Sequence, residues 1–470
     1  MVLVLIIAGR MAISAWLPLM EFSEARYAEI ARKIIDHHDW VTLWFHEGEP
    51  FWGKPPMAFW SVALSYLLLG VNEFSARIPS LLFTLATVAI LFFWVRRHIG
   101  PREARGAVLV YLGSWLVLDT AGAVITDPLL TFATTLVMVS FWEAVAGERA
   151  RYAWLVWFGL GIGLLAKGPL ALVLCGLASG LWVLIYGRWR AFFANIRWLA
   201  GPLLMFVIAV PWYYLAEQRT PGFLDYFIVG EHFERYLESK WAGDLYGSVK
   251  NRPIGTIWIF FLVATLPWSL FFTPRSFKRG NRHAVTEIYR KNPPLYGYLA
   301  CWTLVPLVFF TPARNVIITY ALPAMPAFSI LLSRSAEALV LRRKHLVTLA
   351  TAGTLLFFGG TVLAYYLYFA HHRYNQKPMV EKYLALNRSN PGKLVYTGKP
   401  RFSVIFYTRG KAEFTSDTGS YLDSGRTVYV GVRDRWLEGQ KRQFGDRCTM
   451  ELHRNDYSLW YCPATGNRKR

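Results

Sequence analysis

Long apolar stretches, each close to the length that crosses a bilayer, recur through this 470-residue chain as far as about residue 369. A helix needs about 20 consecutive apolar residues to span the hydrocarbon core. Only 17% of the residues are charged, whereas soluble domains carry about 25%. We therefore predict a polytopic α-helical membrane protein with about eleven transmembrane helices, at 2–19, 76–96, 106–124, 127–145, 153–167, 169–187, 198–216, 254–273, 294–311, 316–333 and 346–369.

The formal net charge of +21 comes largely from short basic loops between these apolar stretches. Such loops are typical of the cytoplasmic side of a membrane protein. They lie at 96–105, 148–151, 188–197, 275–291 and 334–345. No basic face on a soluble fold is visible, so we predict no nucleic-acid partner.

The short apolar stretch 57–70 decides the sidedness of the remaining loops. It is too short to span a bilayer, and we predict a helix that lies at the membrane interface. All basic loops then fall on one side, and the outer side receives 21–60, 217–252 and everything after about 370. The first span is interpreted as a retained anchor, because no small-residue cleavage site follows it.

The tail after residue 376 changes character, with short β-rich stretches separated by Gly, Pro, Asp and Asn. We predict a transmembrane domain at 1–370 and a small soluble α+β domain at 376–470. The predicted helix and strands of the tail are, in order, 379–386, 393–396, 402–407, 427–432 and 458–461. Cys448 and Cys462 can form a disulfide if this tail faces an oxidising compartment.

The segment 21–60 is the first long polar interruption of the apolar sequence, and it is rich in acids and tryptophan. Within it, SEARYAEIARKI predicts a helix that starts near Ser23 with Glu24 in its first turn. Glu24 is either a functional acid or an ordinary first-turn acid, because acids favour helix N-termini in any case.

Asp127 stands at the edge of an apolar stretch, directly before Pro128. An acid in this position is costly unless it is paired or functional. The alternative is an ordinary helix cap before proline.

Basic side chains also lie at predicted membrane boundaries. Lys54 in GKPP and Lys167 in AKGP are placed to meet a lipid phosphate, or they extend to the interface as isolated lysines commonly do. In EHFERY, Glu231, His232 and Arg235 share one helical face, and a guanidinium binds phosphate through two bonds.

Charges in the middle of spans are nearly absent, which favours an enzyme at the outer leaflet over a channel or transporter.

Several motifs in order resemble the lipid-A aminoarabinose transferases and protein O-mannosyltransferases of the GT-C glycosyltransferases. They extend over roughly residues 1–335 and comprise SEARYAEIARKI with the following KPP, TDP at 126–128, AKGPLAL at 166–172, PWYYLAEQ…EHFERY at 211–236, LPW at 266–268 and ITYALPAMPAFS at 318–329. The resemblance implies an enzyme of the bacterial inner membrane that takes a sugar from a polyprenyl-phosphate donor. The acceptor is lipid A, a glycan or a protein, and the active site and C-terminal domain are periplasmic.

The resemblance also implies residue roles. Lys54, Arg235, Lys167 and Tyr320 are expected to bind the donor phosphate, since cations stabilise the departing charge. Arg26, Tyr27 and His232 are predicted to bind substrate. A carboxylate is needed as general base.

This chain departs from its relatives at two of these positions. Ser23 stands where relatives carry an Asp that is regarded as catalytic, so Glu24, Asp127 or Glu21 is the predicted base. The alternatives are that transfer activity is lost or that the acceptor is intrinsically more reactive. Gly53 stands where close relatives carry an acid that helps to hold a structural metal. We therefore predict no cofactor, and the signal for a divalent metal is weak. The alternative function is a non-catalytic binder or transporter of lipid-linked sugars on the same fold.

Overall fold

The computed structural model describes residues 2–21, 23–238, 241–247, 250–271, 279–335, 343–367, 375–454 and 456–464. Parts of the predicted basic loops 275–291 and 334–345, and the ends of the predicted spans 254–273 and 346–369, lie outside these residues. The chain divides into two compact units. The first is Met1–Ala15 with Lys33–Phe358, and the second is Trp16–Arg32 with Gly359–Arg470. The segment from Trp16 to Arg32, predicted as part of the transmembrane domain, thus groups with the C-terminal unit.

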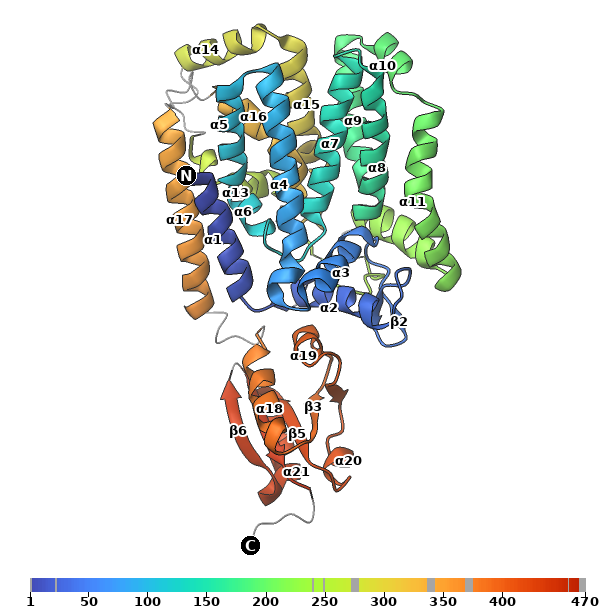
Figure 1. The fold of residues 1–470 in the computed structure, drawn as a ribbon, viewed down its shortest axis with the longest axis vertical. Helices are drawn as coiled ribbons and strands as arrows, with labels where there is room; N and C mark the ends of the chain where they lie inside the picture. Colours follow the sequence, from blue (N-terminus) through green and yellow to red (C-terminus); the bar gives the residue numbers. More distant parts are fainter. Residues whose placement is uncertain are drawn as a thin grey trace. The chain divides into compact units, whose positions relative to one another are not determined.

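The first unit is built from packed α-helices. Its helices, including the larger parts of α1 and α17, are α1 (Val2–Trp16), α3 (Met57–Leu69), α4 (Glu73–His98), α5 (Pro101–Leu112), α6 (Trp115–Thr120), α7 (Asp127–Val145), α8 (Ala153–Lys167), α9 (Leu170–Tyr186), α10 (Trp189–Asn195), α11 (Ala200–Arg219), α12 (Arg235–Leu237), α13 (Thr256–Ala264), α14 (Arg279–Arg290), α15 (Pro293–Phe309), α16 (Met325–Ser335) and α17 (Arg343–Leu367). In Figure 1, α7, α8 and α9 run side by side, and each packs on the other two.

Within the described residues, four helical segments are long and apolar enough to cross a membrane: Glu73–His98, Asp127–Val145, Ala200–Arg219 and Val347–Leu367. Shorter apolar helices accompany them, so a multispan membrane protein is supported, while the number of eleven spans stays a prediction.

Two predicted spans are interrupted. The stretch 106–124 divides into α5 and α6, and 316–333 begins as a 3₁₀ helix, η4 (Ile318–Ala324), before α16. Pro323 lies inside η4, and a proline lacks the N–H that a continuing α-helix requires.

Small residues let α7, α8 and α9 approach closely. A Cβ added to Gly159 would lie 2.8 Å from Val137, and one added to Gly163 would lie 2.4 Å from the Ala171 Cβ. Any larger side chain would push these helices apart, as at other helix contacts in membranes. The close α7–α8 hairpin brings the start of α7 beside the end of α8.

The second unit contains a five-stranded sheet in the order β4-β3-β5-β7-β6. The strands β3 (Lys393–Thr397), β4 (Glu413–Thr415) and β5 (Val428–Arg433) are parallel, and β7 (Tyr457–Cys462) pairs antiparallel with β5 and β6 (Thr449–Arg454). Helices α18 (Lys377–Ser389), α19 (Phe402–Tyr407), α20 (Gly419–Leu422) and α21 (Asp434–Phe444) complete the C-terminal part. The helix α2 (Ser23–Asp36) starts where the sequence predicts it.

One predicted strand is wrong. Residues 402–407 form the helix α19, and Phe402, Ser403, Val404, Ile405 and Phe406 are all buried. A short stretch that is buried on every side has no alternation, so periodicity cannot distinguish a strand from a helix. The short strands β4 and β6 were not predicted.

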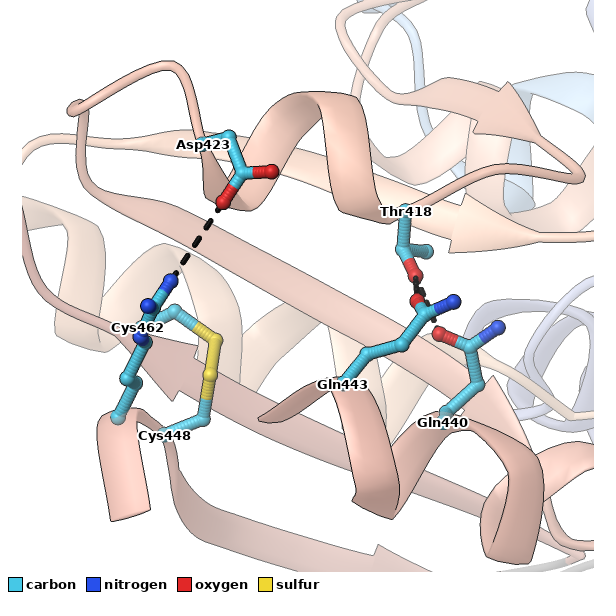
Figure 2. Close-up of a disulfide and its surroundings, with 7 residues drawn as sticks. Thr418, Asp423, Gln440, Gln443, Cys448 and Cys462 are labelled. Atoms are coloured by element: carbon cyan, nitrogen blue, oxygen red, sulfur yellow. Dashed lines mark hydrogen bonds and ion pairs between the residues drawn. A yellow bond between two sulfur atoms is a disulfide. The ribbon is translucent and has the colours of Figure 1, made fainter. Parts of the chain in front are cut away.

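A disulfide between Cys448 and Cys462 joins the ends of the β6–β7 hairpin (Figure 2). Nearby, the Arg447 guanidinium lies 3.5 Å from the Asp423 carboxylate. Cys175 and Cys301 are free and buried in the first unit, as small core residues often are.

Candidate functional site

A cavity of about 330 Å³ lies in the first unit. Its wall is formed by Lys54, Lys167, Pro169, Leu170, Val173, Phe227, Glu231, His232, Phe233, Arg235, Tyr236, Phe309, Phe310, Ala313, Asn315 and Tyr320. Cations and hydrogen-bonding groups therefore share one wall with many apolar side chains. That combination suits an amphiphilic ligand with an anionic group.

Glu231 joins two of the predicted phosphate-binding cations. It lies in the π-helix η2 (Asp225–Glu234), while Lys54 precedes α3 and Arg235 opens α12. The Lys54 Nζ is 3.1 Å from one carboxylate oxygen of Glu231, and the Arg235 Nη1 is 2.8 Å from both oxygens. Burial raises the pKa of Glu231, but Lys54 and Arg235 outweigh burial and hold that pKa below its usual value. Glu231 is thus an ionised carboxylate that fixes both cations at the cavity.

Arg235 has a second carboxylate partner. Its Nη2 lies 3.5 Å from Asp244, and its Nε is buried without a hydrogen-bond partner. Burial lowers the pKa of Arg235, and the negative charges of Glu231 and Asp244 raise it more, so the pKa lies above its usual value. This guanidinium stays charged at every physiological pH.

Lys167 and Asp127 form a second ion pair, 2.6 Å between Nζ and Oδ1. The α7–α8 hairpin brings them together, because Asp127 begins α7 and Lys167 ends α8. The Lys167 ammonium also lies over the Tyr320 ring, 4.9 Å from its centroid, within the range of a cation–π interaction. Lys167 and Tyr320 line the cavity, and Asp127 reaches it through Lys167.

His232 turns both ring nitrogens toward backbone carbonyls. Nδ1 lies 2.7 Å from the Phe227 oxygen, and Nε2 lies 3.2 Å from the Lys167 oxygen. Burial lowers the pKa of His232 more than these carbonyls raise it. Because both ring nitrogens face carbonyl oxygens and both Glu231 oxygens are paired to cations, these residues do not fit a metal ion. The described residues also hold no group of three or more His, Cys, Asp or Glu side chains that suits one.

The other predicted site residues belong to the second unit. One Glu21 oxygen accepts two hydrogen bonds from Ser403, from the backbone N–H and from Oγ, each 2.7 Å long. Burial raises the pKa of Glu21. Glu24 accepts the Met20 backbone N–H at 3.3 Å, and the Arg26 guanidinium lies 5.3 Å from the Tyr27 ring centroid.

The structure thus brings Lys54, Lys167, His232, Arg235 and Tyr320 to one cavity. Their roles, and those of Glu21, Glu24, Arg26, Tyr27 and Asp127, stay predictions. Sequence reasoning missed Asp244, Asn315 and the apolar wall. Asn315 lies in a short turn between two apolar stretches, where nothing but its polarity marked it.

A family model described as dolichyl-phosphate-mannose-protein mannosyltransferase matches residues 53–214. The chain has the fold of a crystal structure of ArnT from Cupriavidus metallidurans bound to undecaprenyl phosphate, with a TM-score of 0.77 and 18% identity, covering 98% of this chain and 97% of that chain. The structure of the same protein in the apo state matches with a TM-score of 0.74. The shared fold and the family-model match support the resemblance to the GT-C type that the motifs predicted, and the long apolar helices support a membrane protein.

Among curated proteins, the chain is similar to undecaprenyl phosphate-alpha-4-amino-4-deoxy-L-arabinose arabinosyl transferases. The protein from Edwardsiella ictaluri is 31% identical over 67% of this chain and 55% of its own length. That from Pseudomonas paraeruginosa is 30% identical over 72% of this chain and 60% of its own length. The chain thus spans a little over half the length of the curated relatives that it matches, and the similarity confirms the predicted resemblance to this type of transferase.

Proposed function

We propose that this protein transfers a sugar from a polyprenyl-phosphate donor to lipid A, a glycan or a protein at the outer face of the bacterial inner membrane. The observation that carries the proposal is the cavity wall. Lys54, Lys167, Arg235 and Tyr320 come from four separate motifs and line one cavity together with apolar side chains. Cations beside an apolar surface match a phosphate on a lipid chain.

In the proposed reaction, an acceptor oxygen or nitrogen attacks the anomeric carbon of the donor. The bond from that carbon to the phosphate oxygen breaks, and the electron pair leaves with the polyprenyl phosphate. Lys54 and Arg235 stabilise the charge that develops on this leaving group. The proton of the acceptor passes to a carboxylate that acts as general base.

Three carboxylates are candidates for this base. Asp127 is paired with Lys167, whereas Glu21 accepts hydrogen bonds from Ser403 and Glu24 accepts one from the Met20 backbone N–H. A carboxylate that is held by a cation is a weaker base, because the cation stabilises its ionised form. We propose Glu24 first, and this choice rests on its position in the SEARY motif.

An outward, periplasmic position of the second unit is part of the proposal. The disulfide between Cys448 and Cys462 supports it, because disulfides persist in oxidising compartments and are rare in the cytosol. The basic loops between the apolar stretches support a cytoplasmic position for the opposite side.

The proposal is tested by sugar transfer from a panel of polyprenyl-phosphate sugars, with the purified protein in lipid nanodiscs. We expect transfer by the wild type and strong losses in Glu24→Gln, Lys54→Ala and Asp127→Asn. Lys441→Ala serves as the control, because Lys441 is exposed and pairs with Glu438 on α21 of the second unit. Donor binding without transfer by the wild type would favour the alternative of a non-catalytic binder. Full activity of Glu24→Gln would exclude Glu24 as the base.

A further inference from the structure

Asn315 is a buried amide in the cavity wall with one uncommitted donor. The residue is 7% exposed and lies in the turn between α15 and η4. Its Oδ1 accepts the Lys250 backbone N–H at 3.3 Å, which fixes the orientation of the amide. Its Nδ2 is buried without a hydrogen-bond partner.

The charged groups of the cavity wall already have partners. Lys54 and Arg235 are paired with Glu231, and Lys167 is paired with Asp127. A phosphate that enters must compete with these carboxylates, so additional donors strengthen its binding. Asn315 Nδ2 and Arg235 Nε are both buried donors without partners on residues of this wall.

An unpartnered buried donor is costly unless a ligand satisfies it. An amide NH₂ group can only donate, so the group that satisfies it must be an acceptor. The cations of the wall select an anionic acceptor. A phosphate oxygen meets both conditions, and it accepts stronger hydrogen bonds than a neutral hydroxyl.

We infer that Asn315 is a further donor-binding residue, whose Nδ2 donates a hydrogen bond to a phosphate oxygen of the polyprenyl-phosphate donor. The inference rests on the proposed function, and it assigns a contact that none of the motifs predicted.

The test is a binding titration of the full chain in nanodiscs, with polyprenyl phosphate and with the polyprenol of the same length. Two variants separate the two ends of the amide. Asn315→Asp keeps the oxygen that accepts the Lys250 N–H and removes the donor, whereas Asn315→Ala removes both without adding charge. We expect each variant to bind polyprenyl phosphate about tenfold more weakly and polyprenol as the wild type does.

Thr319→Val is the matched control. The Thr319 hydroxyl is also buried without a partner and lies on the adjacent segment, but Thr319 is not among the residues of the cavity wall. Its removal should leave both affinities unchanged.

Each other outcome overturns the inference. A loss in Asn315→Ala alone would show that Asn315 only holds the Lys250 backbone. A loss in Asn315→Asp alone would show charge repulsion without a hydrogen bond. Equal losses for polyprenol would indicate a general change of shape. Failure of the wild type to bind polyprenyl phosphate would overturn the proposed function together with this inference, whereas tight binding by both variants would overturn the inference alone.

Discussion

Two groups of ion pairs lie at the cavity, and they differ in how far the surrounding structure encloses them. The Asp127–Lys167 pair stands on two tightly packed helices, and each side chain is 9% exposed. The Lys54–Glu231–Arg235 group stands on a loop and the η2–α12 segment, with Lys54 18% and Arg235 23% exposed. The first pair is enclosed, while the second leaves its cations partly accessible.

This difference separates two tasks that charges perform in a membrane protein. Removing one partner of an enclosed pair leaves a buried charge without its counter-charge. Such a change lowers the stability of the folded protein strongly. Partly exposed cations around one carboxylate contribute less to stability and are better placed to exchange that carboxylate for a ligand. The Asp127–Lys167 pair should therefore govern stability, and the Glu231 group should govern binding.

The largest expected effect is on the enclosed pair. Asp127→Ala removes the carboxylate that pairs with the buried Lys167 ammonium, and we expect a loss of about 3–5 kcal/mol in the free energy of unfolding. Thermal unfolding in detergent measures it. The double variant Asp127→Ala with Lys167→Met should recover most of the loss, and Glu438→Ala at an exposed pair should change little. Equal stability of Asp127→Ala and wild type would remove the contrast between the two groups.

The next effect is on binding. Lys54→Ala should weaken polyprenyl-phosphate binding about 10- to 100-fold, because a charge-assisted contact to phosphate is lost. Its effect on stability should stay near 1 kcal/mol, because Arg235 still compensates Glu231. A titration beside an unfolding curve measures both quantities. A variant that unfolds easily and still binds the donor would reverse the roles assigned to the two groups.

A smaller effect tests geometry rather than charge. Arg235→Lys keeps the positive charge but loses the planar, multiple donors of the guanidinium. We expect the free energy of donor binding to weaken by about 1 kcal/mol. In Arg235→Gln, which also loses the charge, it should weaken further. Equal affinities of Arg235→Lys and wild type would show that charge alone suffices at this position.

The smallest effect is the pH dependence that His232 contributes. Burial lowers its pKa in the folded protein, so below about pH 6.5 the unfolded chain binds more protons at this position than the folded one. Stability from this group is therefore complete above that pH and is lost as the pH falls toward the folded pKa. The free energy of unfolding, measured between about pH 7.5 and 5, should fall less steeply with decreasing pH for His232→Gln than for wild type. Parallel curves would show that His232 titrates equally in both states.

The sequence could predict those parts of the site that carry motifs. The motifs KPP, AKGP, EHFERY and TYALP supplied Lys54, Lys167, Arg235 and Tyr320. The start of α2 at Ser23 followed from its capping pattern.

The remaining parts depend on contacts between distant segments. Asn315 gains its significance from the Lys250 backbone and from the cavity, and no local pattern encodes either. The helix α19 was mistaken for a strand because burial on all sides hides its period. The η2 π-helix and the break at Pro323 are likewise local deviations from a regular helix, which apolar length alone cannot show.

The central claim is that the cations of this cavity hold the phosphate of a lipid-linked donor. A structure of the full chain in nanodiscs with bound polyprenyl phosphate tests it most directly. We predict the phosphate within about 4 Å of the Lys54 Nζ and the Arg235 guanidinium, with the prenyl chain against the apolar wall. A phosphate bound elsewhere, with Glu231 still bridging Lys54 and Arg235 as in the free protein, would contradict the account.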